Sequence, residues 1–354
     1  MARCSNATSR SPRCPSPRPD MATALVTGAT GLLGMHVVQR LQRDRWTVRA
    51  LVRDASRADT LRASGVELAT GDVLDATGFA RAALGCDVVF HTAAAVTPAG
   101  GWDAFQRPNV EGTRHAIDAV AATGARLVHV SSVAVYGGSS RYRDGELTSE
   151  DAVLVPLPDS SWYARSKRES EALVLDAHHA GRIWATAVRP DVIYGQHDRQ
   201  FVPRVARLLQ RGFAPIIGGG QSTLAIVHAE NVADGMVRAA ATDRAGGRAY
   251  NLANDYDVTV EEFFRFAGEG LQMRVRTLRV PYVMAKGVER AFTSIASLLP
   301  RNRFKAVSFS AVDFLARNNP FTSERARREL GWDPRVRPET GVRDAFSWWA
   351  ANHE

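Results

Sequence analysis

The sequence predicts an α/β fold in which helices cover both faces of a parallel sheet, followed by a smaller domain. Two observations in the first half of the chain lead to this fold class. Short runs rich in Val, Leu and other apolar residues recur, and the intervals between them favour helices. Nearly continuous apolar strands that alternate with helices are typical of doubly wound parallel sheets, because both faces of such a sheet are buried.

The predicted strands come at regular intervals. They span Ala24–Thr27, Thr47–Val52, Val66–Thr70, Asp87–His91 and Leu127–Ser131. In the first interval, apolar side chains recur at helical spacing and form one stripe, made of Leu33, Val37, Val38 and Leu41. This interval therefore predicts a helix that packs on the sheet.

The regular alternation ends near residue 140. After a polar stretch that contains prolines, we expect a helix over Ser161–His179, strands over Ile183–Arg189 and Leu224–His228, and a helix over Glu261–Leu271. Residues 21–195 are therefore predicted to form mainly the sheet domain, and residues 196–354 mainly a smaller region interleaved with late elements of the sheet.

The composition excludes several classes of protein. The chain has 354 residues, of which 45% are hydrophobic and 23% charged, so collagen-like, coiled-coil and wholly disordered proteins are excluded. Three cysteines, Cys4, Cys14 and Cys86, cannot form a disulfide framework or a paired metal-binding motif, and we expect no metal and a reducing, cytoplasmic compartment. No apolar stretch is long enough to span a membrane. The nearest, Val283–Leu299, predicts a buried helix of the small domain, with a helix on a membrane surface as the alternative.

The positive charge is unevenly distributed. Residues 1–20 contribute +3 of the net charge of +8, and they contain four prolines and no run of large apolar residues. We expect them to be a disordered tail, or an extension that precedes a true start at Met21. The rest of the chain has no basic stripe interleaved with aromatic residues, so no nucleic-acid partner is expected.

A glycine-rich turn links the first predicted strand to the next helix. Its three glycines are spaced three and three. Glycines permit a tight turn and close approach of the backbone to a pyrophosphate, whose charge is favoured by free N–H groups at a helix N-terminus. The turn predicts a Rossmann domain that binds a dinucleotide, with a chance glycine cluster as the alternative. The predicted cofactor-binding residues here are Gly28, Thr30, Gly31, Leu32, Leu33 and Gly34.

A second candidate site lies on the predicted helix Ser161–His179. Tyr163 and Lys167 are four residues apart and share one helix face. A tyrosine, whose ordinary pKa is about 10, acts as a base near neutrality only when its phenolate is stabilised. A nearby ammonium and a positive nicotinamide supply that stabilisation, so the pair predicts acid–base chemistry. Such pairs also occur on solvated helices.

Together these motifs resemble the extended branch of the short-chain dehydrogenase/reductase superfamily, which is the NAD-dependent epimerase/dehydratase family. The resemblance rests on the glycine turn, on Val130–Gly137, which is similar to an SSxxVYG element, and on the Tyr163/Lys167 pair. It implies that Ser132 hydrogen-bonds the reacting oxygen, with Ser131 as the nearby alternative. The implied catalytic residues are Ser132, Tyr163 and Lys167.

The resemblance also implies a cofactor site. In that superfamily an acidic residue at the end of the second strand binds the ribose of NAD, whereas an arginine pairs with the 2′-phosphate of NADP. Arg53 stands at this place and Asp54 follows one residue late, which favours NADP over NAD. Alternatively, Arg53 is solvated and Asp54 caps the next helix. The other implied cofactor contacts are Asp72, Val73, Ala93, Tyr163, Lys167, Pro190 and Val192.

Two further segments match the same family. His91 begins an HxAA element that lines the cofactor in family members, and a buried structural histidine is the alternative. Asn109 lies in an NVxGT segment that supports the active-site network, and a helix cap or a surface position is the alternative. The resemblance also suggests a homodimer.

The implied reaction is hydride transfer coupled to acid–base catalysis by Tyr163. Val133-Ala134 replace the Asp/Glu pair of sugar dehydratases, so dehydration is not expected. The pattern is closest to 3β-hydroxysteroid dehydrogenases and dihydroflavonol reductases, and the apolar segments Val280–Met284 and Ala291–Leu299 are available to line a pocket. We therefore expect an NAD(P)-dependent oxidoreductase that interconverts a secondary alcohol and a ketone or aldehyde on an apolar, sterol-like small molecule.

Two alternative functions stay open. An NAD-dependent nucleotide-sugar epimerase would bind a diphosphate, for which Arg204, Arg207 and Arg211 are available on one helix. A non-catalytic dinucleotide-sensing protein would share the fold, but such a protein would typically lack the Tyr163/Lys167 pair. Both residues are present in this chain.

Overall fold

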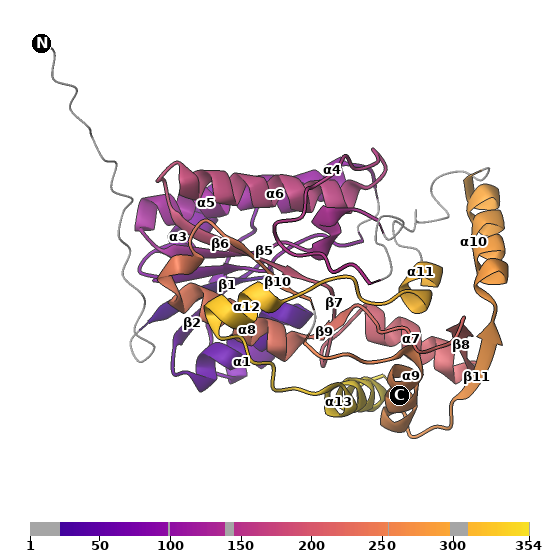
Figure 1. Ribbon diagram of the computed structural model, residues 1–354. Helices are drawn as coiled ribbons and strands as arrows, with labels where there is room; N and C mark the ends of the chain where they lie inside the picture. Colours follow the sequence, from indigo (N-terminus) through magenta and orange to yellow (C-terminus); the bar gives the residue numbers. More distant parts are fainter. Residues whose placement is uncertain (1–21, 98–99, 139–144, 254, 298–310, 354) are drawn as a thin grey trace, which may run out of the picture.

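A computed structural model describes residues 22–97, 100–138, 145–253, 255–297 and 311–353, so the tail 1–20 and Met21 lie outside the described residues. The central sheet is parallel, with strand order β10-β6-β5-β4-β1-β2-β3 (Figure 1). Its strands are β1 (Thr23–Thr27), β2 (Thr47–Val52), β3 (Glu67–Thr70), β4 (Val88–His91), β5 (Arg126–Val130), β6 (Trp184–Pro190) and β10 (Ala249–Leu252). The strand order reverses between β1 and β4, where doubly wound sheets open a ligand-binding crevice. The predicted fold class is confirmed.

Helices cover both faces of this sheet. One face carries α3 (Ala76–Ala83), α5 (Gly112–Thr123) and α6 (Trp162–His179), and the other carries α1 (Leu32–Arg43), α8 (Ala229–Ala241) and α12 (Glu324–Leu330) (Figure 1). Because successive side chains of a strand point to opposite faces, Leu25 of β1 packs with Phe79 of α3, whereas Val26 packs on the α1 side with Val37. The predicted apolar stripe of α1 is buried.

A second core lies beyond the carboxyl edge of the sheet. It is built from α7 (Phe201–Gln210), α9 (Val260–Gly270), α13 (Pro338–Ala351), the strand pair β7 (Val192–Tyr194) with β9 (Ile226–His228), and β8 (Phe213–Ile217). The largely exposed strand β11 (Arg276–Val280) pairs with β8 at the edge of this core. Phe263 and Phe346 meet edge to face at the centre of the core. α9 begins with a capping box in which Thr259 and Glu262 satisfy each other's backbone N–H groups.

The remaining helices and helical turns complete the described chain. They are η2 (Ala55–Arg57), α2 (Asp59–Ala63), α4 (Asp103–Gln106), the π-helical turn η3 (Arg107–Glu111), η4 (Val133–Tyr136), η6 (Asp243–Ala245), α10 (Tyr282–Ser297) and α11 (Ala311–Ala316). Within the described residues, no helix has both the length and the apolar character needed to cross a bilayer.

The prediction of a buried helix over Val283–Leu299 is wrong for the side chains that the structure describes. Val283 and Met284 on α10 are 80% and 63% exposed, so they do not line an enclosed pocket as predicted for Val280–Met284. The physical reason is that polar contacts with α11 hold the opposite face of α10, as detailed below. In the other predicted pocket segment, Ala291 is exposed, the side chains after it are not described, and residues 298–299 lie outside the described residues.

Candidate functional site

The glycine turn lies at the crevice between β1 and β4. Gly28 has a φ of +68°, which favours glycine, and a Cβ there would stand 2.9 Å from the backbone of Ala93 after β4. A Cβ on Gly34 would lie 2.2 Å from the carbonyl oxygen of Gly28. The turn therefore needs glycine at both places for α1 to pack against the end of β1.

The N-terminus of α1 is left open toward this turn. Gly31 is the N-cap residue, and no side chain accepts a hydrogen bond from the first N–H groups of the helix. Apart from the Gly28 carbonyl, a Cβ on Gly31 would meet no atom within 4 Å. Free N–H groups beside an open backbone suit a pyrophosphate, so the turn, with Thr30, Leu32 and Leu33, fits a bound dinucleotide.

At the end of β2 the two candidate cofactor-selecting residues differ in their contacts. Asp54 caps η2, because its Oδ1 accepts hydrogen bonds from the backbone N–H and the hydroxyl of Ser56 at 2.9 and 2.6 Å. The alternative reading of Asp54 as a cap is therefore correct. Arg53 is exposed next to it. Its guanidinium is thus available to a phosphate, while the Asp54 carboxylate is already engaged.

The ends of β3 and β4 close the other side of the crevice. Asp72 accepts the N–H of Leu74 at 2.9 Å, and Val73 packs where Gly112 lacks a side chain. After β4, the backbone N–H of Ala93 donates to Oγ1 of Thr27 at 3.2 Å. These local bonds hold Asp72, Val73 and Ala93 at the carboxyl edge, where the sequence placed them.

His91 is a buried residue. Its Nδ1 lies 2.9 Å from Oγ1 of Thr27, and its ring stacks on His129 with 5.7 Å between centroids. Burial lowers the pKa of His91 to about 3, so the ring is neutral at physiological pH. Among the described residues its Nε2 has no hydrogen-bond partner. These contacts favour the structural alternative for His91.

The three predicted catalytic residues converge where β5 ends and α6 begins. Ser132 lies close enough to Tyr163 for its hydroxyl to act as a hydrogen-bonding partner that lowers the pKa of the phenol. Oγ of Ser132 also accepts the backbone N–H of Ala134 at 3.1 Å, which leaves the hydroxyl proton free to donate. Ser131 is instead fully buried, and its Oγ has no partner among the described residues. Ser132 is therefore the serine that the fold directs to Tyr163.

Lys167 lies one turn after Tyr163 and is almost completely buried. Its Nζ donates to the carbonyl oxygen of Val130 at 2.8 Å. Burial lowers the pKa of Lys167 to about 8, and the nearby Glu171 carboxylate acts in the opposite direction. Burial raises the pKa of Tyr163, and the Ser132 hydrogen bond lowers it. Without a cofactor, the effect of burial is the larger of the two, so the pKa of Tyr163 is raised and the phenol stays protonated. The sequence predicts the opposite, a lowered pKa of Tyr163.

Asn109 ties the loop after β4 to the start of α6. Its side-chain oxygen accepts the N–H of Ala95 at 2.7 Å, and its Nδ2 donates to the Ala95 carbonyl at 3.0 Å and to Oγ of Ser166 at 2.9 Å. Oγ of Ser166 in turn donates to the carbonyl oxygen of Tyr163 at 2.8 Å. Asn109 is buried inside the π-helical turn η3, and such turns are frequent at functional sites. Neither alternative, a cap or a surface position, describes it.

A buried ion pair, which the sequence does not predict, links α6 to strand β6. Arg189 of β6 binds Glu171 of α6 through two hydrogen bonds of 2.9 and 2.6 Å, and both side chains are buried. Arg189 also donates to the hydroxyl of Tyr136 at 2.6 Å, which donates to Asn251 at 2.8 Å. The only sequence signal was a glutamate one turn after Lys167, which gave no hint of its distant partner.

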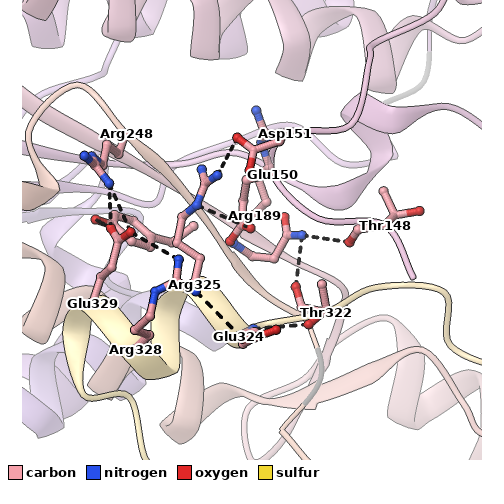
Figure 2. Close-up of polar contacts among 12 residues, drawn as sticks. Thr148, Glu150, Asp151, Arg189, Arg248, Thr322, Glu324, Arg325, Arg328 and Glu329 are labelled. Atoms are coloured by element: carbon pink, nitrogen blue, oxygen red, sulfur yellow. Dashed lines mark hydrogen bonds and ion pairs between the residues drawn. The ribbon is translucent and has the colours of Figure 1, made fainter. Parts of the chain in front are cut away.

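This network continues to helix α12. Figure 2 shows Arg325 of α12 directed at Glu150 and Asp151, and Glu329 directed at Arg248 of the loop before β10. The amide of Asn251 donates to the backbone oxygens of Thr148 and Thr322 at 3.3 and 3.2 Å. Hydrogen bonds and ion pairs thus connect a late segment of the chain to the part of the chain between Ser132 and α6.

The turn between β6 and β7 contains a second residue that sequence reasoning missed. Asp191 lies between Pro190 and Val192, the two predicted cofactor contacts. Its Oδ1 accepts the N–H of Val192 at 2.8 Å, while its buried Oδ2 has no partner among the described residues. Burial raises the pKa of Asp191 well above its ordinary value. The raised pKa favours the protonated form of the Asp191 carboxyl group at this edge of the sheet.

Comparison with known proteins identifies relatives along most of the chain. The sequence matches the NAD dependent epimerase/dehydratase family over residues 24–253. It is 32% identical to the 4-hydroxy-2-methyl-3-oxo-4-farnesyl-3,4-dihydroquinoline-1-oxide ketoreductase of Stigmatella aurantiaca, over 90% of this chain and 93% of the relative. It is 29% identical to a 2-alkyl-3-oxoalkanoate reductase of Shewanella oneidensis (90% and 84%) and 27% identical to 3beta-hydroxysteroid-dehydrogenase/decarboxylase isoform 1 of Arabidopsis thaliana (93% and 81%).

Solved structures share the fold. The crystal structure of gox2253 superposes with a TM-score of 0.75 at 24% identity, covering 94% of this chain and 98% of the other. MoeE5 in complex with UDP-glucose and NAD gives a TM-score of 0.70 at 24% identity, covering 94% and 100%. The glycine turn, the sheet order and the sequence match agree, and we conclude that this chain belongs to the NAD dependent epimerase/dehydratase family.

Proposed function

We propose that this protein is an NAD(P)-dependent oxidoreductase that interconverts a ketone and a secondary alcohol. The observation that carries the proposal is the convergence of Ser132 and Tyr163 where β5 ends and α6 begins, with Lys167 one turn further along the same helix. All three residues lie at the carboxyl edge of the sheet, beside the turn that fits a dinucleotide. In this arrangement one oxygen atom of a substrate can meet both hydroxyl groups.

Each residue has a distinct role in the proposed reaction. Because the oxygen of Ser132 already accepts the Ala134 N–H, its proton is available to hold the carbonyl oxygen of the substrate. The raised pKa of Tyr163 keeps its phenol protonated, which suits a proton donor to the developing alkoxide. The chemistry therefore favours the direction of reduction, in which bound NAD(P)H supplies the hydride.

The cofactor would lie along the carboxyl edge. Its pyrophosphate would meet the N–H groups of the glycine turn, and a 2′-phosphate would pair with the exposed Arg53, since Asp54 is occupied by Ser56. NADP is therefore favoured over NAD. By resemblance to the family, Lys167 would bind the nicotinamide ribose. The remaining proposed cofactor contacts are Asp72, Val73, Ala93, Pro190 and Val192.

The names of the relatives support an apolar ketone as substrate. They describe a farnesyl quinoline, 2-alkyl-3-oxoalkanoates and a 3β-hydroxysteroid, each a keto or hydroxy group on a large apolar skeleton. We propose that residues 196–354 contribute most of the substrate-binding region. Val283 and Met284 are not assigned to it, because both are exposed.

A nucleotide-sugar epimerase is the second candidate. Its support is that a solved structure of similar fold holds UDP-glucose and NAD, and that Arg204, Arg207 and Arg211 are exposed on and just after α7. At 24% identity that likeness concerns the fold alone. The named reductases match the sequence more closely, and they favour the ketone reductase.

The test is a hydride-transfer assay with matched variants. Purified protein is mixed with NADPH or NADH and a panel of 2-alkyl-3-oxoalkanoates, 3-ketosteroids and UDP-sugars, and cofactor absorbance and sugar products are followed. We expect ketone-dependent oxidation of NADPH, with kcat reduced about 10²–10⁴-fold by Tyr163→Phe and by Ser132→Ala. Tyr256→Phe, which removes a hydroxyl bound to Pro334, is the control and should keep full activity. Epimerisation of a UDP-sugar without ketone turnover, or an active Tyr163→Phe variant, would contradict the proposal.

A further inference from the structure

We propose that α10 and the basic strand before it form a surface that docks this protein on an anionic lipid bilayer. The apolar side of α10 consists of residues that recur at helical spacing, and all of them are exposed: Val283, Met284, Gly287, Val288 and Ala291. Of the three largest side chains, Val283 is 80% exposed, Met284 63% and Val288 70%. A run of aliphatic side chains is thus turned to the outside of the protein.

Polar contacts fix this orientation. The hydroxyl of Tyr282 donates to Oδ1 of Asp313 on α11 at 2.9 Å. Nζ of Lys286 donates to Oδ2 of the same aspartate at 2.8 Å and to Glu289 at 2.6 Å. The polar side of α10 therefore faces the protein and the apolar side faces away, which is the reverse of a helix that packs in its own domain. Figure 1 shows α10 standing at the periphery of the molecule beyond α11.

Positive charge is concentrated in α10 and in the strand just before it. Residues 272–291 hold five basic residues against one glutamate. Arg279 pairs with Glu261 and Lys286 pairs with Asp313, both acids outside this segment. Arg274, Arg276 and Arg290 are exposed, and no acidic side chain in the described part of the chain pairs with them.

An anionic bilayer matches both properties of this surface. Aliphatic side chains of an interfacial helix enter the boundary between headgroups and acyl chains, while arginines at the same level bind lipid phosphates. A second copy of this chain is a poor occupant, because a symmetric interface would bring two such positive surfaces together. The inference does not depend on the proposed reaction, since none of these residues belongs to the catalytic site.

Vesicle binding tests the apolar part of the surface. The full chain is sedimented with vesicles of phosphatidylcholine alone or mixed with phosphatidylglycerol, at low and high salt. We expect binding to the mixed vesicles that weakens with salt, and at least a roughly tenfold loss in the Val283→Asp/Met284→Asp variant. Val153→Asp is the control, because Val153 is 86% exposed on a loop elsewhere, and it should bind like the wild type.

Charge reversal tests the basic part. Arg274→Glu/Arg276→Glu should remove the preference for phosphatidylglycerol, whereas Arg45→Glu/Arg81→Glu, two exposed arginines near the opposite edge of the sheet, should leave it. Thermal melting and NADPH affinity check that each variant is folded. Absence of vesicle binding by the wild type, or equal losses in the control variants, would overturn the proposal. So would a wild-type dimer that Val283→Asp/Met284→Asp dissociates while vesicle binding is unchanged.

Discussion

Lys167 donates a hydrogen bond to the carbonyl oxygen of Val130 at 2.8 Å, and this bond joins α6 to the end of β5. The ammonium is almost completely buried at that junction, with the Glu171 carboxylate as its nearby opposite charge. Burying a charge disfavours it, and the pKa of Lys167 falls from 10.5 to about 8 as a result. The candidate site therefore contains a group that opposes folding at neutral pH.

This burial predicts a pH-dependent stability. Between about pH 8 and 10.5 the unfolded chain binds one more proton than the folded chain, so the free energy of unfolding should rise by about 1.4 kcal/mol per pH unit. Below pH 8 both states hold the proton and the full penalty applies. Urea unfolding of Lys167→Met at pH 7 and pH 10 should lack this rise, while the variant loses oxidoreductase activity.

Lys286→Met is the matched control for Lys167→Met. The pKa of Lys286 is raised, because hydrogen bonds to Asp313 and Glu289 outweigh its desolvation. The Lys286→Met variant should therefore still show the rise in the free energy of unfolding between pH 8 and 10.5. A rise that persists in Lys167→Met would show that Lys167 is not the group responsible.

The glycine turn predicts two separable defects. A Cβ on Gly34 meets backbone atoms of Gly28 and Ala29 at 2.2 to 2.8 Å, so Gly34→Ala should lower the free energy of unfolding by about 1–3 kcal/mol. At Gly31 the nearest atom is 3.2 Å away and the rest of the space is open to the cofactor. Gly31→Ala should change stability little but weaken NADPH binding, as measured by fluorescence titration. If Gly34→Ala and Gly31→Ala changed stability equally and NADPH affinity equally, the two defects would not be separable and the prediction would be refuted.

Cofactor choice is predicted to depend on Arg53 and not on Asp54. Arg53→Ala should reduce NADPH affinity by about 10- to 100-fold, the value of a charge-assisted phosphate contact, and leave NADH affinity unchanged. Asp54→Ala should leave the affinity for NADH unchanged, because the carboxylate already binds Ser56. An equal loss of affinity for NADPH and NADH in Arg53→Ala would contradict a contact between Arg53 and the 2′-phosphate.

The fold and the convergence of Ser132, Tyr163 and Lys167 could be predicted from sequence because their signals are local. The strand of Thr47–Val52 was predicted with the bounds that the structure has, since its residues are almost continuously apolar and end at a polar pair. The glycine turn likewise depends on spacing within eight residues. Tyr163 and Lys167 share a helix, so their spacing alone brings them to one face.

The failures concern contacts between distant residues. α10 was expected to be buried because its residues are apolar, but its orientation is decided by Asp313, which follows Tyr282 by 31 residues. The pairing of Glu171 with Arg189 joins a helix to the following strand, and neither residue alone indicates its partner. Whether Tyr163 holds its proton also depends on burial, which spacing does not reveal.

The Glu171–Arg189 pair yields a prediction of its own. Glu171→Gln leaves the buried Arg189 without its counter-charge and should lower the free energy of unfolding by about 3–5 kcal/mol. It also removes the carboxylate that raises the pKa of Lys167, so the high-pH limb of activity should move to lower pH. Asp59→Asn, which breaks the exposed pair with Arg62, should cost less than about 1 kcal/mol in the same urea experiment. Similar losses in the two variants would be incompatible with a buried charge pair.

Asp191 gives the opposite pH dependence to Lys167. Its pKa is raised by burial, so above the unfolded value of 3.8 the unfolded chain releases a proton that the folded chain retains. The free energy of unfolding should then fall by about 1.4 kcal/mol per pH unit until the folded-state pKa is passed. Asp191→Asn keeps an oxygen for the N–H of Val192 and carries no titrating group. In urea unfolding, the variant should therefore become more stable than the wild type as pH rises from 4 to 7. If the difference in free energy of unfolding between the two proteins stayed constant over that range, groups other than Asp191 would cause the pH dependence of the wild type.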